Sequence, residues 1–186
     1  MTGFRVVDTT TRLQSAFLEL VEATVEDPHG ERFTRSIVRH PGAVTVVPVV
    51  DDGPEVILVR QFRAAVGAAI LEAPAGKRDV DGEPPEETAR RELEEEIGHR
   101  AGRLTWLGEC YTSPGFCDEY AFLYAAFDLT PLEERSAVTF EEAEMTVERC
   151  SLEDVDDLIA SRELVDATTM VALLLTRQLL RDGERR

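Results

Sequence analysis

An acidic segment near the middle of the chain constrains the fold and the chemistry more than any other feature. Residues 76–99 read GKRDVDGEPPEETARRELEEEIGH. Residues three and four apart lie on the same face of a helix, so three carboxylates of this segment point together, those of Glu92, Glu95 and Glu96. The same spacing produces an apolar stripe of Ala89, Leu93 and Ile97. The segment therefore predicts an amphipathic helix that starts near Pro84 and Pro85 and ends at Gly98.

The three clustered carboxylates predict a metal site. Like charges on one exposed helix face repel each other, at a cost of roughly 0.2–0.5 kcal/mol for each pair. A hard divalent cation placed among them removes that repulsion. Mg²⁺ takes oxygen ligands and keeps positions open for phosphate oxygens. We therefore expect a divalent cation here, with a phosphate-containing substrate beside it.

Length and charge exclude several other classes of function. The chain has 186 residues, which favours one main domain. It carries 37 acidic residues against 20 Lys and Arg, a formal net charge of −17, so nonspecific binding to nucleic acid or to an acidic membrane is disfavoured. No apolar run approaches the ~20 residues that span a bilayer, and residues 1–14 lack the pattern of a secretory signal. The three scattered cysteines fit reduced thiols in a cytoplasmic protein.

The hydrophobic pattern predicts a mixed α/β (α+β) fold rather than a regular βαβ sheet. Residues 1–40 are predicted to form an N-terminal β element with a hairpin turn at 27–30, and residues 41–186 the main domain. Residues 43–50 are an almost continuous β-branched run, typical of a strand buried on both faces. Further strands are expected at 55–61, 70–72, 104–111, 120–128 and 145–150. Helices are expected at 152–160 and from a cap at Asp166 to about Leu180.

The acidic segment resembles the signature of the Nudix hydrolases, which split a nucleoside diphosphate linked to another group. From Glu83 onward the spacing is regular, with seven residues before Arg91-Glu92-Leu93 and then Glu95-Glu96 and Gly98. Two positions depart from the pattern. Gly76 and Glu83 are separated by one residue more than usual, in the turn-like stretch 79–82, and His99 replaces an aliphatic residue. The resemblance implies the Nudix fold, a mixed sheet sandwiched between helices.

Residues outside this segment resemble the ADP-ribose pyrophosphatase branch, notably that of actinobacteria. Pro114 lies sixteen residues beyond Gly98, and Gln61-Phe62-Arg63 ends a strand. The stretch Glu72-Ala73-Pro74-Ala75-Gly76 leads into the acidic segment. This branch implies hydrolysis of ADP-ribose to AMP and ribose 5-phosphate. A Nudix hydrolase of another nucleoside diphosphate sugar or nucleotide and a non-catalytic ADP-ribose sensor remain alternatives. Sensors, however, tend to lose the carboxylates of the Nudix signature, which are present here.

Several residues are candidates for the site. Two or more Mg²⁺ or Mn²⁺ ions would be held by Glu92, Glu95 and Glu96, with the Ala75 backbone carbonyl added by resemblance. Glu83 is either an auxiliary ligand or a loop anchor. Arg91, four residues before Glu95 and four after Glu87, is expected to orient the carboxylates.

Other candidates would bind substrate or activate water. Arg63 can hold phosphate through its guanidinium fork, or it can be an exposed strand-end residue. Phe62 and Phe116 either stack on adenine or pack in the core, and Pro114 and Gly115 shape the neighbouring loop. By resemblance, a mobile loop supplies a catalytic glutamate, and the candidates in the acidic stretch are Glu141 or Glu142, with Glu144 behind; the alternative is solvated surface. The branch also implies a homodimer formed through residues 1–40.

Overall fold

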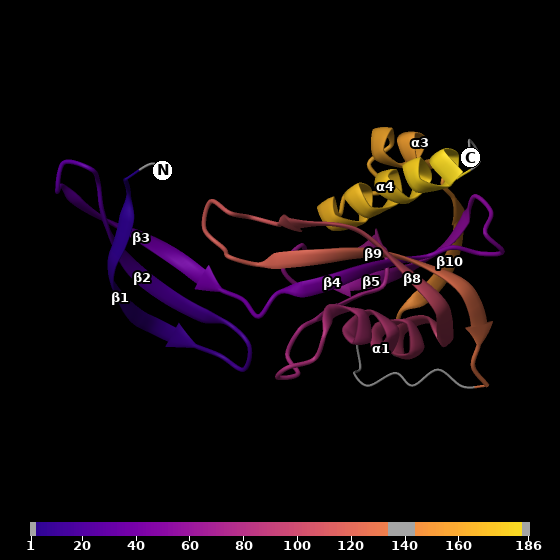
Figure 1. The fold of residues 1–186 in the computed structure, drawn as a ribbon, viewed down its shortest axis with the longest axis horizontal. Helices are drawn as coiled ribbons and strands as arrows, with labels where there is room; N and C mark the ends of the chain where they lie inside the picture. The colour runs from indigo at the N-terminus through magenta and orange to yellow at the C-terminus, as the bar shows by residue number, and fades with distance from the viewer. Residues whose placement is uncertain (1–2, 134–143, 184–186) are drawn as a thin grey trace. The chain divides into compact units, whose positions relative to one another are not determined.

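The computed structural model describes residues 3–133 and 144–183, and the chain divides into two compact units (Figure 1). The first unit comprises Met1–Gly42 and Cys110–Tyr120. The second comprises Ala43–Glu109 and Ala121–Arg186, and it contains the acidic helix. Each unit has its own sheet structure.

The first unit is built on an antiparallel three-stranded sheet in the order β1-β2-β3. Its strands are β1 (Arg5–Gln14), β2 (Glu19–Glu26) and β3 (Arg32–Arg39). The expected turn between β2 and β3 is present, because the Asp27 carboxylate accepts hydrogen bonds from the backbone N–H groups of His29 (2.8 Å) and Glu31 (2.9 Å). The sequence predicted β structure in this region without identifying β1 as a separate strand.

The second unit contains two sheets. Their strands are β4 (Ala43–Pro48), β5 (Glu55–Arg63), β6 (Ala68–Glu72), β7 (Ala75–Lys77), β8 (His99–Tyr111), β9 (Tyr120–Pro131) and β10 (Thr146–Ser151). One sheet has the order β7-β4-β9-β8 and the other β10-β5-β6. The strand β4 pairs in parallel with β9 and antiparallel with β7, so the predicted mixed sheet is confirmed.

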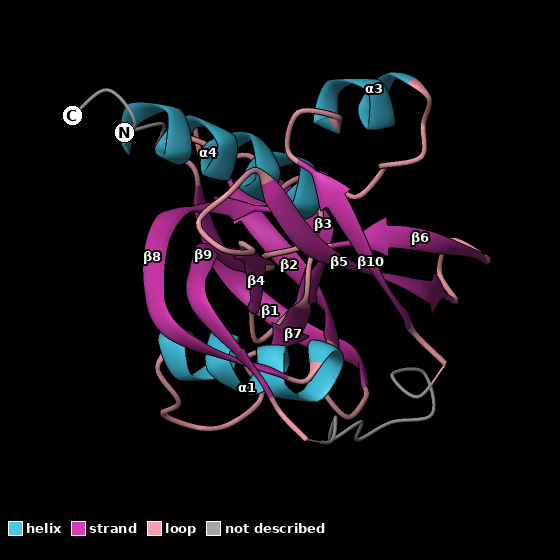
Figure 2. Cartoon of the chain, turned by 90° about the vertical axis from the view of Figure 1, so that its right-hand side faces the viewer, coloured by secondary structure: helices cyan, strands magenta, loops and turns pink. Residues whose placement is uncertain are grey.

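Helices cover this sheet structure on two sides. Figure 2 shows strands of the second unit between α1 (Pro85–Ile97) and α4 (Ala167–Gly183), with α3 (Val155–Ala160) near α4. Both α1 and α4 pack against β4, whose residues 44–48 are all buried. The expected strand with two buried faces is therefore confirmed. Within residues 3–133 and 144–183, no helix is long and apolar enough to cross a membrane.

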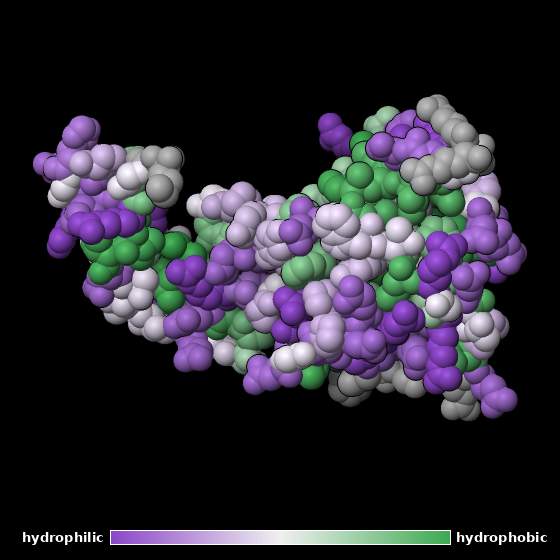
Figure 3. Space-filling view, viewed as in Figure 1, coloured by the Kyte–Doolittle hydropathy of each residue, from purple (hydrophilic) through white to green (hydrophobic). Residues whose placement is uncertain are grey.

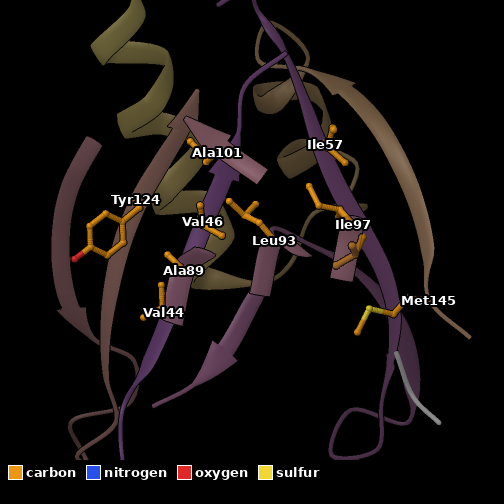
Figure 4. Packing of buried hydrophobic residues seen from close by; sticks show 11 residues of the cluster. Val44, Val46, Ile57, Ala89, Leu93, Ile97, Ala101, Tyr124 and Met145 are labelled. Carbon is orange, nitrogen blue, oxygen red and sulfur yellow. The ribbon is translucent and has the colours of Figure 1, made fainter. Parts of the chain in front are cut away.

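The hydrophobic core beneath α1 joins the helix to β4. Figure 4 shows Ala89 and Leu93 of α1 beside Val44 and Val46 of β4, and Ile97 of α1 belongs to the same cluster. Leu93 and both valines have no exposed surface. This is the apolar stripe that the sequence predicted, and it fixes which face of α1 carries the neighbouring carboxylates.

Several element boundaries differ from the sequence expectation. The strand β8 begins at His99 instead of residue 104, and α3 begins at Val155 instead of 152. No strand was expected between residues 72 and 104, but Ala75 and Gly76 belong to β7 because they pair with Thr45 and Val44 of β4. The final helix extends to Gly183.

Candidate active site

The ends of α1 explain why this segment forms a helix where it does. Pro84 is the N-cap in an extended conformation, and Pro85 is the first helical residue, where the missing N–H has no intrahelical partner to lose. At the other end Gly98 adopts the left-handed conformation (φ 64°), and its N–H donates to the Leu93 carbonyl. Both predicted ends are confirmed.

The carboxylates of α1 differ in their exposure. Glu92 and Glu96 are one helical turn apart and are buried, with 6% and 3% of their surface exposed. Glu95 is partly exposed. Burial of two acidic residues on adjacent turns is costly unless a cation or hydrogen-bond donors compensate for it. The contacts of these residues therefore indicate what the site is built to hold.

Arg91 contacts three of the carboxylates at once. Its Nη1 donates to Glu92 Oε1 at 2.7 Å and to Glu95 Oε2 at 3.2 Å. Its Nη2 lies 3.4 Å from Oε2 of Glu83, whose other partner is the Thr88 hydroxyl at 2.8 Å. The expected i, i+4 pair with Glu95 is therefore present. At the N-terminal end Arg91 pairs with Glu83 in the preceding loop, while Glu87 lies 4.0 Å from Arg90.

The first two residues of β7 lie directly against α1. The Ala75 N–H donates to Glu96 Oε2 at 3.1 Å, and the Pro74 carbonyl accepts from Val46 of β4 at 2.9 Å. Gly76 lies so close to Glu92 that a Cβ there would overlap the Glu92 carboxylate. The backbone of Ala75 and Gly76 therefore lies beside Glu96 and Glu92, while their roles as metal ligands stay predictions.

Electrostatics make Glu96 an unusual carboxyl group. Burial, followed by repulsion from the charge of Glu92, raises the pKa of Glu96 to about 8. The Ala75 N–H and the positive charge of Arg63 act in the opposite direction. A nearby cation would lower this pKa, because positive charge favours the ionised form.

The donor set fits a hard divalent cation. Three carboxylates and a backbone carbonyl supply only oxygen atoms, the ligands that Mg²⁺ prefers. As the side chains stand in the described part of the chain, no group of three or more His, Cys, Asp or Glu residues is close enough to hold an ion. Arg91 accounts for part of this, because Glu92 and Glu95 both turn toward its Nη1. Binding of an ion by all three carboxylates would require those contacts to loosen.

Arg63, a candidate for binding phosphate, is held by a residue that sequence reasoning missed. Its Nε donates to Glu72 Oε1 at 2.9 Å and its Nη2 to Oε2 at 2.6 Å. Gln61, two residues earlier on the same face of β5, donates to Glu72 Oε2 at 2.9 Å. The hydrogen bonds that Arg63 donates to Glu72 raise the pKa of Arg63 above its ordinary value. The available signal was a single carboxylate at the end of the apolar strand 68–72.

A second residue missed by sequence reasoning is Thr169 near the start of α4. Its hydroxyl accepts a hydrogen bond from the Ala73 N–H at 2.9 Å, across 96 residues of sequence. A threonine in the first turn of a helix is ordinary, so no local pattern marks it. Its partner follows only from the fold.

The remaining predicted residues lie elsewhere in the chain. Phe62 is 55% exposed at the end of β5, so it is not a core residue. Pro114, Gly115 and Phe116 lie in the 112–116 stretch of the first unit, where Phe116 is 59% exposed. Glu144 is exposed. Glu141 and Glu142 lie outside the described residues, so their part in catalysis stays a prediction.

Comparison with known proteins assigns the chain to a family. Residues 39–170 match the NUDIX domain. The ADP-ribose pyrophosphatase of Bacillus subtilis is 45% identical over 156 residues, which cover 84% of this chain and 83% of that protein. The ADP-ribose pyrophosphatase of Mycobacterium tuberculosis is 34% identical over 171 residues, or 92% of this chain and 82% of that protein.

The fold is matched as well as the sequence. The crystal structure of an ADP compounds hydrolase superposes with a TM-score of 0.83 at 26% identity and covers 98% of this chain and 97% of that one. The Nudix signature of α1 and its preceding loop lies inside the matched range. The chain therefore belongs to the Nudix family and is a Nudix pyrophosphohydrolase.

Proposed function

We propose that this enzyme hydrolyses the diphosphate of ADP-ribose to AMP and ribose 5-phosphate and that it depends on Mg²⁺ or Mn²⁺. The observation that carries the proposal is the pair of buried carboxylates on α1, with the Ala75 N–H bonded to Glu96 and Gly76 lying against Glu92. The choice of substrate is supported by the two relatives that are ADP-ribose pyrophosphatases, and by the match to an ADP compounds hydrolase.

The proposed metal ligands are Glu92, Glu95, Glu96 and the Ala75 carbonyl, with two or more ions in each site. Cations bound there neutralise the diphosphate oxygens and make a water molecule more acidic. Arg91 holds Glu92 and Glu95 on the same side of the helix through its Nη1. Glu83 anchors the preceding loop through Arg91 and Thr88, which favours the anchor over the auxiliary ligand.

Arg63 is the proposed phosphate contact. Glu72 holds its guanidinium, and Arg63 is partly exposed, so one side of the fork can still face a ligand. Phe62, exposed at the end of β5 next to Arg63 in the chain, is the proposed aromatic surface for adenine. The parts of Pro114, Gly115 and Phe116, which belong to the first unit, stay predictions. Glu141 or Glu142 is the proposed catalytic base, with Glu144 as the third candidate.

The test of the proposal is AMP release from ADP-ribose with Mg²⁺, comparing the native chain with Glu96→Gln. We expect turnover in the native chain and a loss of about 100-fold or more in the variant, because glutamine lacks the negative charge that holds the cation. Glu94→Gln is the matched control, since Glu94 lies on the same helix but pairs with Arg100 at 2.9 Å. Equal loss in both variants would contradict a specific role for Glu96.

A substrate panel separates this proposal from its alternatives. Hydrolysis of another nucleoside diphosphate sugar or nucleotide, with ADP-ribose left intact, would keep the Nudix chemistry and reject the substrate. Binding of ADP-ribose without hydrolysis of any compound would identify a sensor. The signature carboxylates are all present, Glu92, Glu95 and Glu96, which favours an enzyme over a sensor.

We also propose that the enzyme is a cytoplasmic homodimer. In the first unit all ten residues of β1 are exposed, and β1 is an edge strand of its sheet. Apolar side chains gather on the surface of this unit (Figure 3), including Phe4, Val6 and Leu13, each more than half exposed. An exposed edge with apolar side chains is suited to pairing with a second chain.

A further inference from the structure

Thr169 connects α4 to the loop beside the carboxylates. Its side chain is completely buried, as is Ala73, whose N–H donates to the Thr169 hydroxyl at 2.9 Å. Thr169 stands outside the acidic segment and carries no charge. Its hydroxyl reaches the backbone two residues before Ala75, the proposed carbonyl ligand.

Thr169 is itself held firmly in place. Asp166 caps α4, because its Oδ2 accepts the Thr169 N–H at 2.7 Å. The same oxygen accepts the Thr168 hydroxyl at 2.7 Å. The first turn of α4 therefore presents the Thr169 hydroxyl from a rigid element instead of a loop.

The segment 73–75, which leads into β7, is tied to three different elements by three successive residues. Ala73 is bonded to Thr169 of α4, Pro74 to Val46 of β4, and Ala75 to Glu96 of α1. The Pro74 and Ala75 bonds hold the segment to β4 and α1, and the Thr169 bond ties its beginning to α4. Without the Thr169 bond, residues 73 and 74 are free to shift about the remaining contacts, and the Ala75 carbonyl at the start of β7 shifts with them.

We propose that Thr169 is a positioning residue for the metal site: its hydroxyl fixes the 73–75 backbone so that the Ala75 carbonyl and Glu96 face the same cation. The inference rests on the proposed function, because it assumes a divalent cation at that point. Loss of the acceptor would leave the buried Ala73 N–H without a partner, and the loop would shift to find one. Supporting contacts of metal ligands commonly change metal affinity by about 10–100-fold, and a displacement of about 1 Å can lower a rate by ~10²-fold.

The test uses Thr169→Val, which keeps the shape of the side chain and removes the acceptor. Thr169→Ser restores a hydroxyl. Thr176→Val is the matched control, since Thr176 is also fully buried on α4 but its hydroxyl donates within the helix, to the Ala172 carbonyl at 2.8 Å. Each full-length variant is compared in Mn²⁺ binding by calorimetry, in the kcat and KM of ADP-ribose hydrolysis, and in urea unfolding.

We expect Thr169→Val to weaken Mn²⁺ binding about 10-fold or more and to lower kcat more than it raises KM. Thr176→Val should bind Mn²⁺ within about 2-fold of the native chain, and Thr169→Ser should recover most of the affinity. If Thr169→Val and Thr176→Val lose stability alike and both bind Mn²⁺ normally, Thr169 is a structural residue and the inference is wrong. If Thr169→Val does not fold, Thr169→Ala against Thr176→Ala makes the same comparison.

The two proposals fail in different ways. A native chain that binds Mn²⁺ but releases no AMP from ADP-ribose rejects the proposed substrate, while the Mn²⁺ comparison of the Thr169 variants still decides the inference. A native chain that binds no Mn²⁺ overturns the inference directly. Normal hydrolysis with unchanged Mn²⁺ affinity in Thr169→Val overturns the inference and leaves the proposed function intact.

Discussion

At the scale of single residues, the site depends on one very close approach between backbone and side chain. Gly76 belongs to β7, and the Glu92 carboxylate lies where its Cβ would be. The glycine is required by this contact and not by its backbone conformation, because its φ is not positive. A larger residue would push aside the flexible end of Glu92 and leave the strand in place.

We therefore expect Gly76→Ala to impair catalysis more than folding. Displacement of Glu92 should lower the rate of AMP release by about 10-fold or more. The free energy of unfolding should change by about 1–3 kcal/mol at most, as for modest overpacking. The rate and the free energy of unfolding are also measured in the control Gly183→Ala, where an added Cβ meets no atom within 4 Å. Full activity in Gly76→Ala would mean that Glu92 need not occupy its observed position.

The ion pair between Arg60 and Glu148 predicts a dependence of stability on pH. Arg60 Nε donates to Glu148 Oε1 at 2.7 Å and Nη2 to Oε2 at 3.2 Å, and these hydrogen bonds lower the pKa of Glu148 below its ordinary value of 4.5. A lowered folded-state pKa contributes stability that is present above pH 4.5 and is lost as the pH falls through the folded-state pKa.

Glu148→Gln should accordingly destabilise the protein near neutral pH by about 0.5–1 kcal/mol, because both side chains are partly exposed. The difference from the native chain should shrink between neutral and acid pH, as the pH falls through the folded-state pKa and the carboxyl becomes protonated in the folded as well as the unfolded state. Urea unfolding near neutral pH and at acid pH measures this difference in the free energy of unfolding, with Glu153→Gln, at an exposed position, as the control. A difference that persists undiminished at low pH would show that the ion pair is not its source.

At the scale of elements, α1 combines a packing face with a chemical face. Leu93 has no exposed surface and lies in the core with Val44 and Val46, while its neighbour Glu92 lies against Gly76 of β7. The position of the carboxylates therefore depends on how tightly the apolar stripe is held. Stability and activity are coupled through this one helix.

Leu93→Ala should lower the free energy of unfolding by about 2–5 kcal/mol, the usual range for a large core residue cut back to alanine. Leu174→Ala on α4 is the control, because Leu174 is 38% exposed and its loss should cost about 1 kcal/mol or less. Urea denaturation measures both. Equal effects would show that the packing of α1 against β4 does not dominate the core.

The elements differ in how far sequence alone could predict them. The helix α1 was predicted with both ends, because proline, glycine and the apolar stripe are local signals. The strand β7 was not, because its three residues form a strand only by pairing with β4. The contacts of Glu72 and Thr169 were missed for the same reason, since each depends on partners brought close by the fold. The roles of Glu141 and Glu142 remain predictions from resemblance.

At the scale of the whole molecule, net charge acts on association. The chain carries a formal charge of −17, so two copies repel each other, while the apolar residues along β1 favour contact. Screening weakens the repulsion, and the Debye length is about 8 Å at physiological ionic strength. The proposed dimer should therefore be stabilised by added salt.

Light scattering coupled to size exclusion should report twice the mass of the chain, with dissociation at high dilution occurring more readily in low salt. Leu13→Lys, which places a charge on the exposed apolar surface of β1, should shift the equilibrium to monomer. Thr9→Lys, on the same strand but replacing a polar exposed residue, should have a smaller effect. A native chain that stays monomeric at micromolar concentration and physiological salt would reject the dimer.

The stretch between β7 and α1 can vary in length without moving the two elements that it connects. The strand ends at Lys77 and the helix begins at Pro85, and residues 79–82 between them are exposed. Both flanking elements are anchored independently, β7 by pairing with β4 and α1 by its core face. The residue that this chain has beyond the usual Nudix spacing can therefore be absorbed in the turn without moving Gly76 or Glu92. Residues 79–82 are therefore a place where the chain accepts inserted residues, and even a foreign loop, while Gly76 and Glu92 beside α1 keep their positions.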